Sequence, residues 1–393
     1  MLIGDKMFQF RANEYTAIIW LALAHGVCDI YGGFINPLMP FISEKLGFSL
    51  AIATTIIAIT QVCSNMLQPI FGFFADNILK RFFIFWGLIF ASIFIPFAPA
   101  LANAKLFMLF MIIGCVGGSL FHPQAMGFIN TFSKDNYSKN MGKFVFAGSF
   151  GFALGPLIAS TITQNAGLEN IVYTSILGFI TASAMFFMVP KLSKTYKITK
   201  TKNFIEAFKE IITNSQINIV MLIAMMKSLI VNCCCILLPF LWKSLGYKPI
   251  YIGIALFLFV FAGSLGSLTS AFFEKKYGTN NILRFSLIAT FPILVLFSQI
   301  YNSMPITSMI AFALIGFITN LSQPLTIILA QKILPQYKSI VSGFANGFCW
   351  GITAIILSAL GLIAEKIGII NVLLIISIIP IFASYTIKYL KKY

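Results

Sequence analysis

Four residues that can carry a charge fall within long apolar stretches of the chain: His25, Asp29, His122 and Lys227. His25 and Asp29 are four residues apart, so on a helix one lies above the other on the same face. A carboxylate near the centre of a bilayer costs roughly 2.5–3.5 kcal/mol and rarely faces lipid. We therefore predict that Asp29 faces a water-filled cavity or a base and carries a proton, with His25 assisting. A static, paired carboxylate is the alternative interpretation.

The composition indicates what must position these residues. The chain has 393 residues, of which 59% are hydrophobic and 10% are charged, and its mean hydropathy is +0.92. These values exclude a soluble domain and indicate an all-α membrane protein. The net charge of +16 does not indicate a nucleic-acid partner, because the basic residues sit in short loops between apolar stretches. The N-terminus has no signal-peptide cleavage site, so the first stretch is expected to direct its own insertion.

Apolar stretches separated by polar loops predict twelve transmembrane helices. They are expected at 15–38, 50–74, 82–101, 106–131, 143–165, 170–190, 217–242, 250–273, 282–301, 305–331, 340–364 and 369–389. Lys and Arg number 21 in the two termini and the loops on their side of the membrane, but only five in the opposite loops. The positive-inside rule then predicts a multi-pass protein of the cell inner membrane, with both termini in the cytoplasm.

The longest polar loop, residues 191–216, divides the chain into an N-terminal part, 1–190, and a C-terminal part, 217–393. The second portion of this loop places apolar residues on one face of a helix: Phe204, Ile205, Phe208, Ile211 and Ile212. That spacing predicts a short cytoplasmic helix that lies on the membrane surface. A flexible linker without a partner is the alternative.

Short motifs recur in the same order in both parts. MPFISEKLG (39–47) matches LPFLWKSLG (238–246) at an offset of 199, and FHPQ (121–124) matches SQPL (322–325) at an offset of 201. These matches predict a duplication of six helices into two pseudo-symmetric halves. Parallel six-helix repeats place the substrate site near the membrane midplane between the halves.

The duplication also relates Asp29 to Lys227. At the offset of 199, Asp29 corresponds to Ser228, which follows Lys227. We predict that Asp29 and Lys227 face each other across the cavity as an ion pair, which would offset the cost of burying both charges. Protonation of Asp29, or a substrate anion at Lys227, would break this pair and favour another conformation. The alternative is a static pair that locks the halves together.

Further polar residues at helical spacing are candidates for substrate contact. His122 precedes Pro123, which bends a helix and frees a carbonyl group, so His122 can face the cavity. The others are Gln61, Asn65, Asn320, Gln323, Asn346 and Trp350. Each can line the cavity or form hydrogen bonds between helices, and the glycines near His122 can serve helix packing alone. The cysteines lie in apolar stretches without metal-ligand spacing, so no metal is expected.

Two motifs carry a resemblance to a known family. Residues 72–81, GFFADNILKR, resemble the loop between helices two and three of the major facilitator superfamily, from which they depart at Asn77 and Leu79. The glycine, the alanine at 75, the aspartate and the two closing bases match, and the candidates for the function of this loop are Gly72, Asp76, Lys80 and Arg81. In that family the loop gates the cytoplasmic side, which implies the same role for these residues. A second run resembles the G-x-x-x-G-P motif of antiporters in this superfamily through Gly151, Gly155 and Pro156.

Together with His25, Asp29 and the run 121–123, these motifs resemble the fosmidomycin-resistance branch of the superfamily over nearly the whole chain. The resemblance implies a proton-coupled exporter that moves a small molecule by alternating access, as drug efflux proteins do. The basic groups of the cavity favour an anionic substrate such as a phosphonate or a carboxylate. No cofactor is expected, because the chain lacks a phosphate-binding glycine-rich motif with Lys. A monomer is expected.

Three other functions are open from the sequence. The first is an importer of a metabolite or of a metal-chelating organic anion on the same fold. The second is a membrane enzyme, such as an acyltransferase with His122 as its base. The third is a sensor that binds a ligand without moving it. The loops are short and contain no histidine, so we predict that the protein is not an enzyme.

Overall fold

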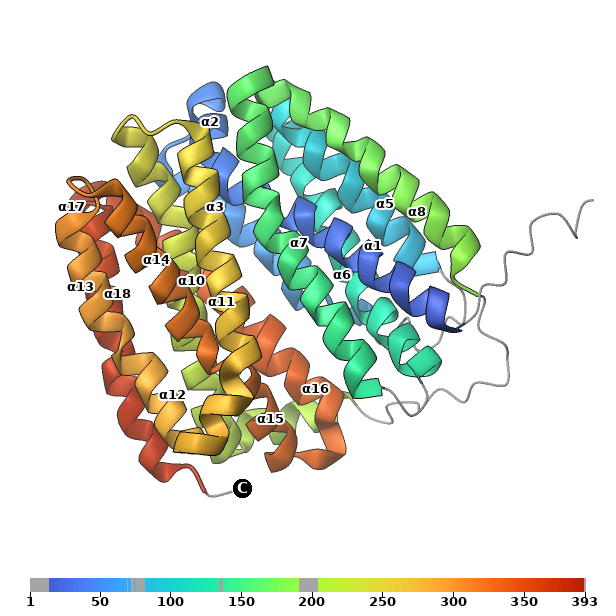
Figure 1. The fold of residues 1–393 in the computed structure, drawn as a ribbon, viewed down its shortest axis with the longest axis vertical. Helices are drawn as coiled ribbons and strands as arrows, with labels where there is room; N and C mark the ends of the chain where they lie inside the picture. The colour runs from blue at the N-terminus through green and yellow to red at the C-terminus, as the bar shows by residue number, and fades with distance from the viewer. Residues whose placement is uncertain are drawn as a thin grey trace, which may run out of the picture.

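The computed structural model of the protein describes residues 14–68, 70–71, 74, 82–133, 137–190 and 204–391. Every regular element in these residues is a helix, as the composition predicts. The helices form two bundles (Figure 1), one coloured blue to green and the other yellow to red. We call them the N-terminal half and the C-terminal half.

The N-terminal half begins with a span that is interrupted at Gly33 and Phe34, and its next helix begins after Ser49, whose side chain accepts the N–H of Ile52. Its elements are α1 (Glu14–Gly32), α2 (Ile35–Leu46), α3 (Leu50–Gln61), η1 (Val62–Met66), α5 (Phe82–Phe97), η2 (Ala98–Ala100), α6 (Ala104–Ser133), α7 (Tyr137–Ala166), η4 (Leu168–Thr174) and α8 (Ser175–Met188). The element η1 is a π-helical turn within the second span.

The C-terminal half follows a short linker helix, α9 (Phe204–Thr213), and its first long helix is capped by Asn214. Its elements are α10 (Ser215–Ser244), α11 (Pro249–Tyr277), α12 (Thr279–Ile288), α13 (Thr290–Ile300), α14 (Pro305–Leu321), α15 (Gln323–Ile333), η5 (Pro335–Tyr337), α16 (Lys338–Gly343), η6 (Phe344–Phe348), α17 (Cys349–Ile367), α18 (Ile369–Ser384) and η7 (Tyr385–Tyr389). The element η6 is a second π-helical turn.

The positions of the helices agree with the spans predicted from the sequence. In the described residues, eleven helices are long and apolar enough to cross a membrane. A shorter apolar helix, Leu50–Met66, stands where the span 50–74 is predicted, and the chain beyond Gln68 is described only in part. The all-α membrane architecture is therefore confirmed.

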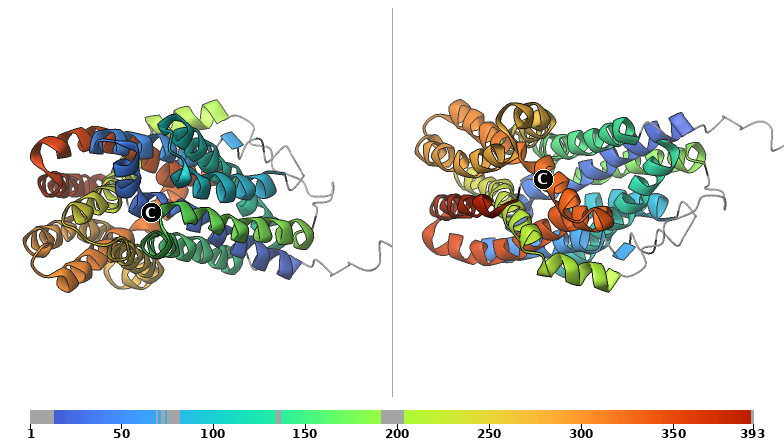
Figure 2. Two further views of the ribbon diagram at one scale, coloured as in Figure 1. Left: turned by 90° about the horizontal axis from the view of Figure 1, so that it is seen from above. Right: turned by 90° about the horizontal axis from the view of Figure 1, so that it is seen from below.

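The two halves meet along two pairs of helices, α7 with α11 and α3 with α17. Figure 1 shows α7 and α11 side by side where the bundles meet, and in both views of Figure 2 blue segments of the N-terminal half lie beside orange-red helices of the C-terminal half. At the end where α2 finishes, Glu44 Oε2 lies 2.7 Å from Lys243 Nζ. At the same end, Glu365 Oε1 accepts the backbone N–H of Ala51 at 2.8 Å. Charged contacts therefore fasten the halves at this end.

The linker helix α9 forms as predicted and packs on the C-terminal half. Ile211 is fully buried, and the ring of Phe208 lies 5.5 Å from that of Phe344. Ile205, on the same helix, is 78% exposed. The helix therefore has a packed face and a free apolar face, and its contact with the membrane surface stays a prediction.

Candidate functional site

Asp29 stands between two histidines within the N-terminal half. Its Oδ2 lies 3.2 Å from His25 Nε2, and its Oδ1 lies 3.4 Å from His122 Nε2. His25 and Asp29 come from successive turns of α1, whereas His122 comes from α6, immediately before Pro123. The Asp29 side chain is 22% exposed, so the cluster is enclosed but not sealed. The structure thus brings together three of the four titratable residues selected from the sequence.

The hydrogen bonding of His25 fixes which of its atoms faces Asp29. His25 Nδ1 lies 2.8 Å from the carbonyl oxygen of Phe144 in α7. A carbonyl oxygen only accepts hydrogen bonds, so Nδ1 carries the hydrogen. A neutral His25 with an ionised Asp29 would then point a nitrogen lone pair at a carboxylate oxygen. One proton between Nε2 and Oδ2 removes this repulsion, so the geometry favours a shared proton.

A glycine-rich face of α7 covers this cluster. A Cβ atom added at Gly148 would lie 2.7 Å from Asp29 Oδ2, closer than a side chain permits. At Gly151 and Gly155 an added Cβ would collide with the backbone of α1, and Pro156 packs against Gly33, which follows α1. Small residues in the antiporter-like motif thus allow α1 and α7 to approach closely. The motif therefore packs directly against α1, the helix that carries Asp29.

Lys227 lies in α10, is 1% exposed, and donates a hydrogen bond from Nζ to Oε1 of Gln323. Gln323 is the first residue of α15, where the tenth span is interrupted at Ser322. The predicted ion pair between Asp29 and Lys227 is wrong for this structure. Each residue instead contacts polar groups within its own half, two histidines for Asp29 and an amide for Lys227.

These partners occupy equivalent places in the duplicated sequence. His122 corresponds to Gln323 at the offset of 201, and the proline that follows each of them is also shared. Asp29 and Lys227 stand within one residue of equivalence at the offset of 199. Both halves therefore contain a contact between a charged residue of the first repeat helix and a polar residue of the fourth.

Sequence reasoning missed Asn232, which links the halves, and Thr353, its partner within the C-terminal half. Gln61 Nε2 donates to Asn232 Oδ1 at 3.3 Å, and Asn232 Nδ2 donates to Thr353 Oγ1 at 3.0 Å. The chain of hydrogen bonds runs from α3 in the N-terminal half to α10 and α17 in the C-terminal half. Asn232 is an isolated amide in an apolar run five residues after Lys227, and that was the available signal.

The remaining predicted residues are less informative. The amides of Asn65 and Asn320 donate to carbonyl groups of their own helices. Trp350 lies in α17 and is half-buried, and Asn346 lies in η6 with a side chain outside those described. The predicted gating residues all lie outside the described residues: Gly72, Asp76, Lys80 and Arg81. Their roles stay predictions.

The cluster of His25, Asp29 and His122 contains residue types that bind metal ions. In the part of the chain that the structure describes, the ligand atoms of His25, Asp29 and His122 lie within 4.8 Å of one another. The contacts of 3.2 Å and 3.4 Å are of hydrogen-bond or ion-pair length and are accounted for by protons alone. The expectation of no metal stays a prediction.

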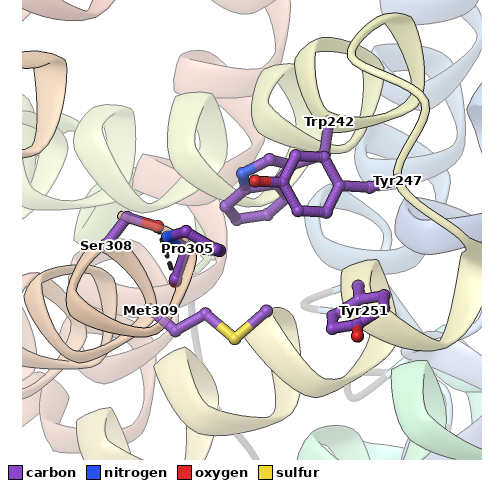
Figure 3. A pocket seen from close by; sticks show the side chains of 6 residues that line it. All are labelled: Trp242, Tyr247, Tyr251, Pro305, Ser308 and Met309. Atoms are coloured by element: carbon purple, nitrogen blue, oxygen red, sulfur yellow. Dashed lines mark hydrogen bonds between the residues drawn. The ribbon is translucent and has the colours of Figure 1, made fainter. Parts of the chain in front are cut away.

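A small cavity lies in the C-terminal half between α10, α11 and α14 (Figure 3). Its lining residues are Trp242, Tyr247, Tyr251, Pro305, Ser308 and Met309. The hydroxyl of Ser308 donates to the carbonyl oxygen of Pro305 at 2.8 Å. The cavity has a volume of about 10 Å³, which is room for about one water molecule. It is too small to be a substrate site.

Comparison with known proteins places this geometry in a wider group. Residues 21–359 match the family model described as Major Facilitator Superfamily. The chain is 24% identical over 383 residues to the fosmidomycin resistance protein of Escherichia coli K12, covering 93% of this chain and 91% of that protein. It is 28% identical over 166 residues to the "Probable nitrate transporter NarT" of Staphylococcus epidermidis, covering 42% of each chain.

Two solved structures share the fold. The nucleoside transporter NupG superimposes with a TM-score of 0.73 at 14% identity, over 96% of this chain and 99% of that chain. A bacterial homolog of the human lysosomal transporter Spinster, in an inward-facing and occupied conformation, superimposes with a TM-score of 0.72. It is 14% identical, and the match covers 95% of this chain and 96% of that chain.

Proposed function

This chain belongs to the Major Facilitator Superfamily, and we propose that it is a proton-coupled secondary transporter that exports a small anionic molecule. The observation that carries the proposal is the contact of Asp29 Oδ2 with His25 Nε2 at 3.2 Å, where His25 Nδ1 is already committed to Phe144. This arrangement calls for one proton that the cluster can hold and release. The matched relatives are transporters, so the protein is not an enzyme.

The coupling proton is shared between His25 and Asp29, and His122 is the second base in contact with this carboxylate. The helix α7 contributes no titratable group at the contact, because Gly148 covers the cluster there. Loss of the proton leaves a carboxylate between two imidazole rings. This charge state favours one of the two conformations, in which the central site opens to one side of the membrane. Uptake of a proton neutralises the carboxylate and favours the other conformation, because each charge state has its own preferred surroundings.

The substrate anion is held on the C-terminal side of the same site, near Lys227. This ammonium group is 1% exposed, and its contact is a neutral amide rather than a carboxylate. In the described residues no carboxylate is paired with it. A buried positive charge with a neutral partner favours an anion when the halves part. Gln61 and Asn232, which meet where the halves join, are the polar groups expected to contact the rest of the substrate.

Export is favoured by the match to a fosmidomycin resistance protein, whose name describes resistance to a drug. The distribution of 21 against five basic residues supports an inner-membrane location with both termini in the cytoplasm. With that orientation, the loop 72–81 and its bases face the cytoplasm and are proposed to gate that side. Exchange of an outgoing anion for an incoming proton would use the proton gradient directly.

Import of an anion is the second candidate, and one observation favours it. The stretch shared with the "Probable nitrate transporter NarT" is more similar, at 28% identity, than the whole-length match to the resistance protein, at 24%. That stretch covers only 42% of the chain, so it says less about the complete transport path.

Transport assays separate the two directions. Inside-out membrane vesicles containing the protein are given an inside-acid pH gradient and labelled fosmidomycin as the probe. Uptake that requires the gradient indicates export in the cell, whereas uptake only in right-side-out vesicles indicates import. Glu169→Gln is the matched control, because Glu169 is an exposed carboxylate of the same half that pairs with Lys45. It should transport as the unaltered protein does.

A further inference from the structure

Two π-helical turns face each other across the boundary between the halves. They are η1 (Val62–Met66) in the second span and η6 (Phe344–Phe348) in the eleventh, and they are in contact. A Cβ atom added at Gly347 in η6 would lie 3.2 Å from the carbonyl oxygen of Asn65 in η1. Such turns are rare within α-helices and are frequent at functional sites. The second and eleventh spans therefore touch where each of them departs from the regular α-helical register.

The turn η1 frees backbone carbonyl groups, and side chains take them up. The carbonyl oxygens of Cys63 and Ser64 lie 2.5 Å and 2.7 Å from Ser119 Oγ of α6. A hydroxyl group has one hydrogen, so Ser119 donates to one of these two oxygens at a time. The two acceptors are adjacent in the chain, so Ser119 can reach either of them from one position on α6.

Ser119 also stands next to the proton cluster. It lies three residues before His122 on α6, which places both side chains on the same face of that helix. His122 Nε2 in turn lies 3.4 Å from Asp29 Oδ1. An added Cβ at Gly118 would lie 3.5 Å from Ser64 Oγ and 3.8 Å from His122 Nε2, so η1 and His122 approach each other here. The same face of α6 therefore carries His122, which contacts Asp29, and Ser119, which contacts η1.

We propose that Ser119 is a positioning residue that couples the charge state at Asp29 and His122 to η1, and through η1 to η6. The inference rests on the proposed proton coupling and adds the part that moves. When Asp29 changes its charge, His122 shifts on α6, the Ser119 hydroxyl changes carbonyl partner, and η1 moves against η6. The two π-helical turns are then the places where the second and eleventh spans flex between conformations.

The test measures conformation and needs no transported substrate. Spin labels are attached through ketone-bearing amino acids at positions 173 and 306, whose side chains are 67% and 76% exposed on the two halves. Distance distributions are compared with and without Asp29→Asn, which imitates the protonated carboxyl. We expect Asp29→Asn to shift the distribution when Ser119 is present, and to leave it unchanged together with Ser119→Ala. Ser119→Thr, which keeps the hydroxyl, should restore the shift.

Ser92→Ala is the matched control. Ser92 is as fully buried as Ser119, but its hydroxyl donates within its own helix, to the carbonyl oxygen of Ile89. Ser92→Ala should leave the response to Asp29→Asn intact. If Ser119→Ala also leaves it intact, or if Ser92→Ala abolishes it, Ser119 only ties helices together and the inference is overturned. An absence of any shift with Asp29→Asn alone overturns it as well.

A second pair of variants tests the facing turns in transport of labelled fosmidomycin. Gly347→Ala places a methyl group against Asn65, whereas Gly343→Ala, four residues earlier, meets nothing within 4 Å. Gly347→Ala should lower the maximal rate about tenfold with KM within about twofold, as expected when a conformational step is slowed. Gly343→Ala should leave both the maximal rate and KM unchanged. Equal rates for both variants contradict a flexing role. If the unaltered protein moves no fosmidomycin, the export proposal fails, while the distance measurement still decides the role of Ser119.

Discussion

In the N-terminal half, the paired positions on the first and fourth spans carry Asp29 and His122, and in the C-terminal half their counterparts are Lys227 and Gln323. The Asp29 side chain is 22% exposed, whereas Lys227 is 1% exposed. One duplicated contact has thus become an acid between bases that water can reach, and the other an enclosed cation on an amide. This difference is the reason that we propose proton exchange in the first half and anion binding in the second.

The largest effect is expected from Asp29→Asn, which removes the titrating group and keeps its size. Transport driven by a pH gradient should be abolished, because no proton can be released at this position. Exchange of labelled for unlabelled fosmidomycin across proteoliposomes should remain measurable, because Lys227 and its partner are untouched. Both activities are measured in the same proteoliposomes. Survival of gradient-driven transport would make Asp29 a structural carboxylate.

Lys227→Met sharpens the comparison from the other half, because it removes the charge and keeps most of the volume. A hydrogen bond to a charged group contributes about 1.5–3 kcal/mol, so substrate affinity should fall about tenfold to hundredfold. Unlike Asp29→Asn, this variant should lose exchange and gradient-driven transport together. The half-saturating fosmidomycin concentration in both assays measures the change. Loss of gradient-driven transport alone would assign Lys227 to proton coupling instead.

Gly148→Ala asks whether the glycine face of α7 sets the geometry of the acid cluster. The new methyl group would crowd His25 and Asp29 Oδ2 and should destabilise the protein by about 1–3 kcal/mol, as overpacking does. Gly142→Ala is the control on the same helix, since nothing lies within 4 Å of its position. Thermal unfolding in detergent and gradient-driven transport check the pair. If the melting temperatures of Gly148→Ala and Gly142→Ala were the same, α7 would have to move away from α1 at Gly148 without loss of stability.

A smaller effect is expected from Asn232→Ala, which removes the hydrogen bonds that join Gln61 to Thr353 through Asn232. A neutral hydrogen bond contributes about 1 kcal/mol, and two are lost here. Because the bridge joins the halves, the distance distribution between labels at 173 and 306 should broaden without loss of the fold. Thr353→Val, which removes only the second hydrogen bond, should have the smaller effect of the two. A larger effect for Thr353→Val would place the important contact within the C-terminal half.

The architecture was open to prediction because it depends on local properties. The length of each apolar stretch indicates where a span lies. The motifs repeated at offsets of 199 and 201 indicate which span of the first half corresponds to which span of the second. Asp29, His25 and His122 were found for a related reason, since a titratable group in an apolar run is conspicuous. Spacing on α1 alone placed His25 beside Asp29, as the structure has it.

The partner of Asp29 was not open to prediction in the same way. The sequence offered Lys227 by symmetry, yet contacts across the halves depend on how two bundles lean on each other. Within one bundle the fourth span passes closer, so His122 reaches the carboxylate first. The π-helical turns and the contacts of Ser119 were also not predicted, because one extra residue in a helical turn leaves no periodic pattern in the sequence. The role of Asn232 was not predicted, because a single amide in an apolar run is equally expected to form an ordinary hydrogen bond between neighbouring helices.

Infrared difference spectroscopy of the purified protein during a pH titration tests the shared proton most directly. The carboxyl band of Asp29 and the imidazole bands of a histidine should change together, over one pH range, because one proton serves both groups. Asp29→Asn should remove the carboxyl change and displace the imidazole change. A spectrum that Asp29→Asn leaves unaltered would show that this carboxylate does not exchange a proton.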